Sequence, residues 1–241
     1  MSINKVFEQY AELFNFETEE KWSKSICGIT AQFGFEQTLL AILKNKYDPL
    51  ENAFIRSNYS SDWRSTYDNQ KLGYVDPTVT HCLTSTGPLV WTPEVFVSSK
   101  QKYMYEEAAS YGLRSGVIFP IHGANGEFGM FTVVSETLNN SSNRKELLNA
   151  IPILSIIRDY VFQSSKKFIK NNLTVDVQLT PRELEVLKWA MVGKSAWEKS
   201  IILNCSESTI KFHLSNIRRK FDVGTVQQAI ISAIRLGIIQ P

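Results

Sequence analysis

The chain has 241 residues with a formal net charge of +2, and hydrophobic residues make up 43% of it. This apolar content is enough for a packed core and excludes a disordered or low-complexity protein. No apolar run approaches the roughly 20 residues that a membrane helix needs, and we expect no signal peptide. The cysteines Cys27, Cys82 and Cys205 are far apart. They argue against a disulfide framework or a cysteine-rich zinc site and favour a cytoplasmic location.

Charge is distributed unevenly along the chain. Residues 1–163 carry 14 basic and 18 acidic side chains, whereas residues 164–241 carry 12 basic and 6 acidic ones. A basic C-terminal part indicates a polyanionic partner. A polar, basic segment begins at Ser164, so we predict domains over 1–165 and 179–241 joined by a linker over 166–178.

Hydrophobic spacing predicts a layered N-terminal domain. Helical spacing alternates with strand-like runs. In chain order, we predict helices over 6–14 and 22–33, strands over 37–43, 53–57, 117–121 and 128–134, and a helix over 143–162 that Pro152 kinks or divides. Asn125-Gly126 marks a hairpin turn between the last two strands. The fold class is therefore α+β: an α-β-α sandwich with a mainly antiparallel sheet, joined to an all-α C-terminal helix-turn-helix domain.

The C-terminal part has the pattern of a compact helical bundle. Thr180, Pro181 and Glu183 form a helix start signal, and Gly193 ends that helix. Further helices are predicted over 196–203, 208–221 and 227–236. A helix, a short turn and a basic helix make the layout of a helix-turn-helix.

The third of these helices is the predicted recognition helix. Ile210, Leu214 and Ile217 repeat at helical spacing and should pack inward. Polar and basic residues occupy the other faces, where they can meet phosphates and base edges. A basic helix alone is more often a solvated surface, but the surrounding motif favours DNA. The predicted DNA-binding residues are Thr209, Lys211, His213, Ser215, Asn216, Arg218, Arg219 and Lys220.

This C-terminal pattern resembles the LuxR-type helix-turn-helix over about 60 residues. The matching positions are Leu179–Leu187, Gly193–Ser195, Glu198, Ile202–Leu203, Ser206–Glu207, Thr209–Lys211, His213, Asn216–Ile217, Lys220–Phe221 and Leu236–Ile239. Lys199 departs from the pattern, since the family has an aliphatic residue there, and we expect looser packing around it. The segment 224–226 also departs, and we expect it to lack a phosphate contact.

The N-terminal domain contains an aromatic and acidic constellation. Tyr59, Trp63 and Tyr67 are spaced by four, so they share one helix face. Such a stripe is more often core than pocket, but Asp76 lies nearby with few basic neighbours. A buried carboxylate needs hydrogen-bond donors, and a ligand N–H would serve. Few polar groups in an apolar cavity describe a small-molecule site.

The constellation resembles the autoinducer-binding domain of LuxR-type receptors, most like the LasR-type, long-acyl branch. The resemblance implies an N-acyl-homoserine lactone ligand. It implies that Trp63 donates to the lactone carbonyl, Asp76 accepts from the amide N–H, and Tyr59 with Thr132 meets the amide carbonyl. The implied ligand-binding residues are Tyr59, Trp63, Arg64, Tyr67, Asp76, Thr78, Trp91, Phe96, Leu113, Ile118 and Thr132. Candidates for the acyl-tail pocket are Leu39, Leu43, Phe54, Leu113, Val117, Ile118 and Val134.

Arg64 is expected to reach a substituent at acyl carbon 3, and Trp91 and Tyr67 to wall the lactone head. Thr78 is expected to orient Asp76 or to touch the head group. Phe96 stands where the long-acyl branch has Tyr, so a hydroxyl contact is missing there.

The resulting hypothesis is a ligand-responsive transcriptional activator in quorum sensing. It would bind the lactone, dimerise on a palindromic promoter element and contact RNA polymerase. The alternative is a regulator with the same DNA module and a different effector or none. An enzyme acting on acyl-lactones is disfavoured, because Asp76 has no paired carboxylate and no nucleophile has a visible base. We expect no metal and no cofactor. The acidic residues also lack the arrangement that a receiver domain needs to accept a phosphoryl group.

Overall fold

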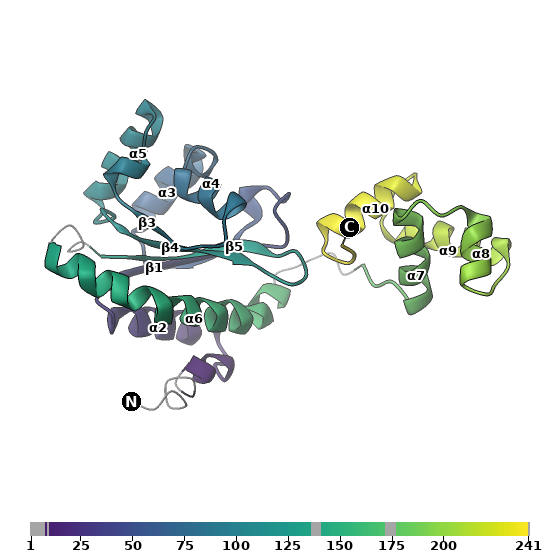
Figure 1. The fold of residues 1–241 in the computed structure, drawn as a ribbon, viewed down its shortest axis with the longest axis horizontal. Helices are drawn as coiled ribbons and strands as arrows, with labels where there is room; N and C mark the ends of the chain where they lie inside the picture. The colour runs from purple at the N-terminus through teal and green to yellow at the C-terminus, as the bar shows by residue number, and fades with distance from the viewer. Residues whose placement is uncertain (1–7, 9, 136–140, 172–176, 241) are drawn as a thin grey trace. The chain divides into compact units, whose positions relative to one another are not determined.

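The computed structural model describes residues 8, 10–135, 141–171 and 177–240. The chain forms two compact units: one holds the described residues up to 171 apart from 124–126, and the other holds 124–126 and residues 177–240. The first contains a sheet with helices on both of its faces, and the second contains helices (Figure 1).

The sheet of the first unit is antiparallel throughout the described residues. Its five strands are β1 (Gln37–Leu43), β2 (Phe54–Ser57), β3 (Leu89–Trp91), β4 (Gly116–His122) and β5 (Phe128–Val134). Their order is β2-β1-β5-β4-β3. Thr132 in β5 lies opposite Leu39 on one side and Ile118 on the other. Gly126 closes the β4–β5 hairpin with a φ of 89°, as the Asn-Gly pair predicted.

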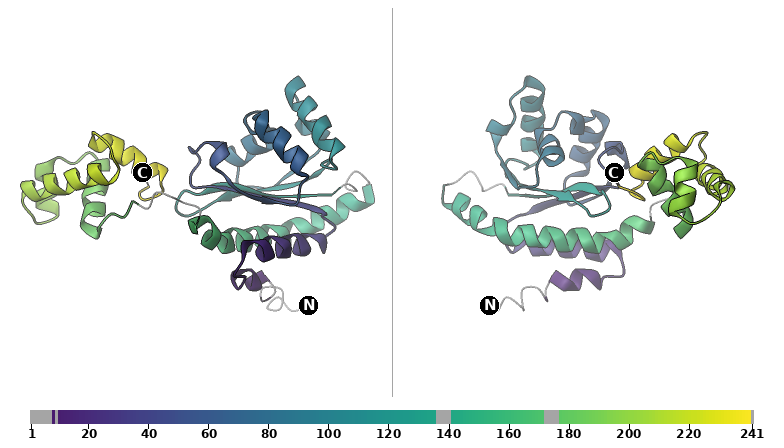
Figure 2. Two further views of the ribbon diagram at one scale, coloured as in Figure 1. Left: turned by 180° about the vertical axis from the view of Figure 1, so that it is seen from behind. Right: turned by 45° about the vertical axis from the view of Figure 1, so that its right-hand side comes forward.

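Helices cover both faces of this sheet, which confirms the predicted sandwich. On one face lie α2 (Glu19–Ala31) and α6 (Ser141–Asn171), and on the other lie α3 (Ser61–Asn69), α4 (Pro77–Thr84) and α5 (Ser99–Ser110) (Figures 1 and 2). Short 3-10 turns span Glu12–Phe14, Leu50–Asn52, Leu72–Tyr74 and Pro93–Val95. Each face of the sheet has its own cluster of buried apolar side chains.

Helix α6 is longer than predicted, and Pro152 lies inside it without ending it. A proline removes one backbone donor, and packing of the remaining turns outweighs that loss here. The residues 166–171, predicted as linker, continue the helix. Ser164 is not part of a linker: its hydroxyl accepts a hydrogen bond of 2.9 Å from Trp22 Nε1. Phe168 packs against the same indole with 5.2 Å between ring centroids and an interplanar angle of 46°. The polar composition of this segment therefore belongs to a packed helix.

The second unit contains α7 (Pro181–Met191), α8 (Ala196–Ile202), α9 (Glu207–Lys220) and α10 (Val226–Arg235), each within two residues of its prediction. Thr180, Ser195, Ser206 and Thr225 cap these helices through their side chains. Asn204, with a φ of 48°, turns the chain between α8 and α9. Helices α8 and α9 pack together, which confirms the helix-turn-helix.

Candidate functional site

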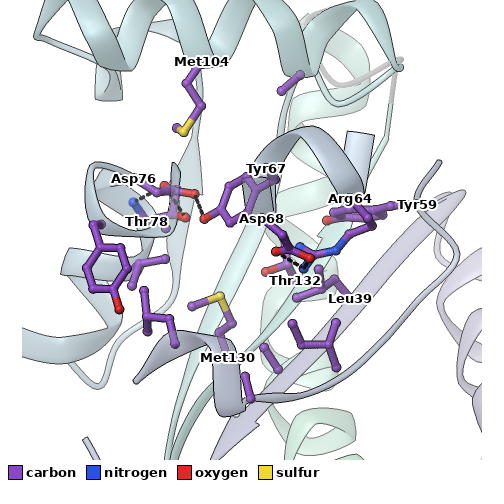
Figure 3. Close-up of a pocket in the computed structure, with 18 of the residues that line it drawn as sticks. Leu39, Tyr59, Arg64, Tyr67, Asp68, Asp76, Thr78, Met104, Met130 and Thr132 are labelled. Carbon is purple, nitrogen blue, oxygen red and sulfur yellow. Dashed lines mark hydrogen bonds and ion pairs between the residues drawn. The ribbon is translucent and has the colours of Figure 1, made fainter. Parts of the chain in front are cut away.

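A cavity of about 320 Å³ lies between the sheet and helices α3, α4 and α5 (Figure 3). Every predicted ligand-binding residue except Ile118 lines it. The lining residues that the sequence had indicated are Leu39, Leu43, Tyr59, Trp63, Arg64, Tyr67, Asp76, Thr78, Trp91, Phe96, Leu113 and Thr132. Residues spread between positions 39 and 132 thus converge on one mainly apolar cavity.

Four of the predicted pocket residues do not line the cavity. Phe54 and Val117 belong to the apolar cluster on the opposite face of the sheet. Ile118 and Val134 lie on the cavity side but are enclosed by neighbouring side chains. Alternate residues of a strand point to opposite faces, so only the pairing register decides which ones reach the cavity.

Sequence reasoning missed several lining residues. The strands contribute Ala41, Ile55, Phe128, Gly129 and Met130; helix α5 contributes Met104, Tyr105 and Ala108; the remaining ones are Leu50, Glu51, Ala53, Asp68, Lys71, Gly73, Tyr74 and Val79. Period-two spacing from Leu39 could have found Ala41, and spacing from Thr132 could have found Met130. No local signal pointed to α5.

Asp76 is held by donors of this chain. It caps α4: Oδ1 accepts hydrogen bonds from the Thr78 backbone N at 2.8 Å and from the Thr78 hydroxyl at 2.7 Å. Oδ2 accepts one of 2.9 Å from the Tyr67 hydroxyl. Burial raises the pKa of Asp76, and these three hydrogen bonds oppose the rise without cancelling it. Thr78 and Tyr67 therefore both contact the carboxyl, and the expected roles of Thr78 stay predictions.

Arg64 has an acidic partner inside the cavity. Its Nη2 contacts the two carboxylate oxygens of Asp68 at 2.8 and 3.0 Å, and its guanidinium lies 5.4 Å from the Tyr67 ring centroid. Figure 3 shows this ion pair beside Tyr59, Thr132 and Leu39. Because Asp68 balances the charge of Arg64, the cavity offers this cation as part of a neutral pair.

Aromatic rings form much of the remaining wall. Trp63 packs against Tyr67 at 5.7 Å between centroids, and Phe96 packs against Tyr105 at 5.0 Å. The Trp91 indole N–H is buried, and none of the described residues accepts a hydrogen bond from it. An apolar, aromatic cavity with a few fixed polar groups is suited to a small molecule that has a polar head and an apolar tail.

The second candidate surface is the polar side of α9. Lys211, Ser215 and Arg219 are exposed on it, and Thr209, His213, Asn216 and Arg218 are partly exposed. Arg218 donates a hydrogen bond of 3.2 Å to the Gly224 carbonyl, and Arg219 donates one of 3.1 Å to Asn216.

Lys220 has a structural role in the second unit. Its ammonium lies 2.6 Å from Glu183 Oε2, and this carboxylate also accepts from the Thr180 backbone N. The pair fixes the end of α9 to the start of α7. Contact between Lys220 and DNA stays a prediction.

Lys199 is almost completely buried on α8, with 4% of its surface exposed. Loss of hydration lowers its pKa, since burial disfavours the charged ammonium. An aliphatic side chain would avoid this cost, so the position is a poor environment for lysine. Looser packing around it stays a prediction.

Two family models match the chain. Residues 18–165 match an autoinducer binding domain, and residues 177–233 match the luxR family of bacterial regulatory proteins. The chain belongs to the LuxR family. The LuxR-type chain has the two domains of a quorum-sensing transcriptional activator, a class of regulator rather than of enzyme.

The relatives of this LuxR-type chain extend over most of its length. The transcriptional activator protein VanR of Vibrio anguillarum is 32% identical over 215 residues, 89% of each chain. The transcriptional activator protein LuxR of Aliivibrio fischeri is 34% identical over 90% of this chain and 87% of its own. Escherichia coli SdiA has the same fold, with a TM-score of 0.78 and 22% identity over 99% of both chains.

Two further features of the LuxR-type chain concern the described residues. No three His, Cys, Asp or Glu side chains among them come close enough to hold a metal ion. None of their helices combines the length and hydrophobicity needed to cross a membrane.

Proposed function

We propose that the cavity binds an N-acyl-homoserine lactone and that the chain then binds promoter DNA as a dimer in the cytoplasm. The observation that carries the proposal is that Asp76, Tyr59 and Trp63 line the same cavity, whose other walls are mainly aromatic and aliphatic. A lactone head with an amide has donors and acceptors for such groups, and its acyl chain suits the apolar remainder.

Each polar group has a proposed partner on the ligand. Asp76 accepts from the ligand amide N–H as a further donor beside Tyr67 and Thr78. Trp63 donates to the lactone carbonyl, and Tyr59 with Thr132 meets the amide carbonyl. The acyl chain lies along β1 and β5, and a long chain remains our expectation.

Mass spectrometry tests the ligand directly. The full chain is expressed in cells fed a mixture of homoserine lactones with short to long acyl chains, then purified and extracted. We expect one lactone to be retained at about one per chain and little to be retained by Asp76→Asn. Retention of a different acyl compound, or of nothing, would support the alternative effector or the effector-free regulator.

The DNA-binding proposal rests on the exposed polar side of α9. One recognition helix covers few base pairs, so two copies on half-sites about one helical turn apart would supply specificity. We expect an inverted repeat of roughly 20 base pairs. Lys211→Ala should weaken DNA binding, leave lactone affinity unchanged and reduce the salt slope by about one unit. A monomer that bound a single half-site with full affinity would contradict the dimer.

Contact with RNA polymerase is supported by an exposed apolar patch on α8, defined as Trp197 and Ile201. These residues are 61% and 59% exposed and lie one turn apart. An exposed apolar pair on the helix that packs against α9 favours a protein partner. Trp197→Ala should therefore retain DNA binding and lose transcription activation in a purified system. Loss of both would assign the patch to DNA or to folding.

A further inference from the structure

The outward side of α9 carries one large apolar residue among polar ones. Phe212 is 62% exposed, whereas Ile210 and Ile217 on the same helix are fully buried. At 3.6 residues per turn, Phe212 lies opposite the direction that these isoleucines share. Ser208, Ser215 and Arg219 occupy the same outward side. Phe212 is therefore at the centre of the surface proposed to enter DNA.

The ring of the next residue lies close to the Phe212 side chain. The His213 ring lies 5.7 Å from the Phe212 ring between centroids, at an interplanar angle of 64°. The polar and basic residues around Phe212 can contact phosphates and base edges, but a phenyl ring can make only apolar contacts. The apolar group that base pairs present in the major groove is the C5 methyl of thymine.

We infer that Phe212 contacts a thymine methyl group in each half-site and specifies thymine at that position. The inference rests on the proposed function and adds a base preference to it. Lysines and arginines on α9 would supply attraction to any duplex, whereas Phe212 would distinguish thymine from the other bases. A second macromolecular partner covering Phe212 would instead leave DNA preference independent of this residue.

Deoxyuridine provides the sharpest test, because it lacks only the C5 methyl of thymine. The preferred duplex is first selected from a random-sequence library with the full chain and lactone. Each thymine of a half-site is then replaced singly by deoxyuridine, together with its symmetry mate, and affinity is measured by fluorescence anisotropy.

We expect one symmetric pair of replacements to lower wild-type affinity about 15-fold, because the burial of two methyl groups is lost. Phe212→Ala should bind the unmodified duplex at least about 10-fold more weakly and should no longer respond to those replacements. Its affinity for a random duplex should be unchanged, because phosphate contacts remain. Ile231→Ala is the matched control, since Ile231 is an exposed apolar residue on α10, and it should behave as wild type.

Three outcomes would overturn the inference: a wild type insensitive to every deoxyuridine, a Phe212→Ala variant with wild-type sensitivity, or selected half-sites without thymine. Circular dichroism checks that Phe212→Ala folds, and Phe212→Leu keeps the test valid if it does not, since it should retain part of the sensitivity. A wild type that binds no duplex at all would instead contradict the proposed function.

Discussion

The two faces of the sheet in the first unit are packed very differently. Toward α2 and α6, the fully buried rings of Trp22, Phe119 and Phe131 fill the space. Toward α3, α4 and α5, the same strands border a cavity of about 320 Å³. The difference shows how a protein can maintain a cavity. Dense packing on the face toward α2 and α6 makes the strands rigid, and the face toward α3, α4 and α5 presents side chains of the same strands to the cavity.

The largest expected effect comes from removing a large side chain from the densely packed face of the sheet, the one toward α2 and α6. Phe131→Ala should lower the free energy of unfolding of the ligand-free first unit by about 3–5 kcal/mol, because it creates a new void in a dense core. Met130 is the adjacent residue on β5 and lines the existing cavity. Met130→Ala should cost about 1 kcal/mol or less. Urea unfolding monitored by near-ultraviolet circular dichroism measures both, and equal losses would contradict the comparison.

Binding of a lactone in the cavity should stabilise the first unit alone. At a free lactone concentration about 100 times Kd, the free energy of unfolding should rise by about 2.7 kcal/mol. Differential scanning calorimetry of the full chain should show this rise in the transition of residues 1–172 and not in that of residues 173–241. A shift in both transitions, or in neither, would disagree with a ligand confined to the cavity.

Asp76→Asn should reduce lactone binding in the cavity more than it reduces the stability of the first unit. A hydrogen bond to a charged group contributes about 1.5–3 kcal/mol, so lactone affinity should fall about 10–100-fold. Asp62→Asn is the control, because Asp62 is exposed on α3 and does not line the cavity. Titration calorimetry compares the two variants, and equal affinities would remove Asp76 from the site.

The smallest expected effect is a pH dependence assigned to Asp76. Burial raises its pKa in the folded chain above the ordinary value of 3.8. The folded state thus holds this proton more tightly than the unfolded state. The stability contribution of Asp76 therefore declines as pH rises from the ordinary pKa of 3.8 through the raised pKa of the folded chain. An amide donor favours the charged carboxylate, so lactone affinity should fall as pH decreases through the raised pKa. Asp76→Asn should flatten this dependence in calorimetric titrations at several pH values; an unchanged slope would assign it elsewhere.

Local patterns predicted the strands β1, β2, β4 and β5 and the helices of the second unit, because alternation and capping residues act within a few positions. These patterns did not predict which face of the sheet each apolar side chain occupies. Phe54 and Val117 look as apolar as Leu39, and only the pairing of their strands turns them away from the cavity.

Local patterns also could not predict where polar side chains find their partners in the folded chain. The Arg64–Asp68 ion pair lies within one helix, but its position in the cavity depends on the packing of α3 over the sheet. Lys220 was predicted to contact DNA, and no local pattern indicated its ion pair with Glu183, which is far away in sequence. The roles of the ligand-binding residues came from family resemblance and stay predictions.

The pairing of β1 with β5 has a consequence for synthesis. Residues 37–43 border the cavity only after residues 128–134 have joined them, so the cavity forms late in the first unit. The second unit follows the first in the chain and is translated after it. At about 5–20 residues per second, translating residues 173–241 takes roughly 3–14 s. During that interval the strands that border the cavity can pair before the second unit is complete.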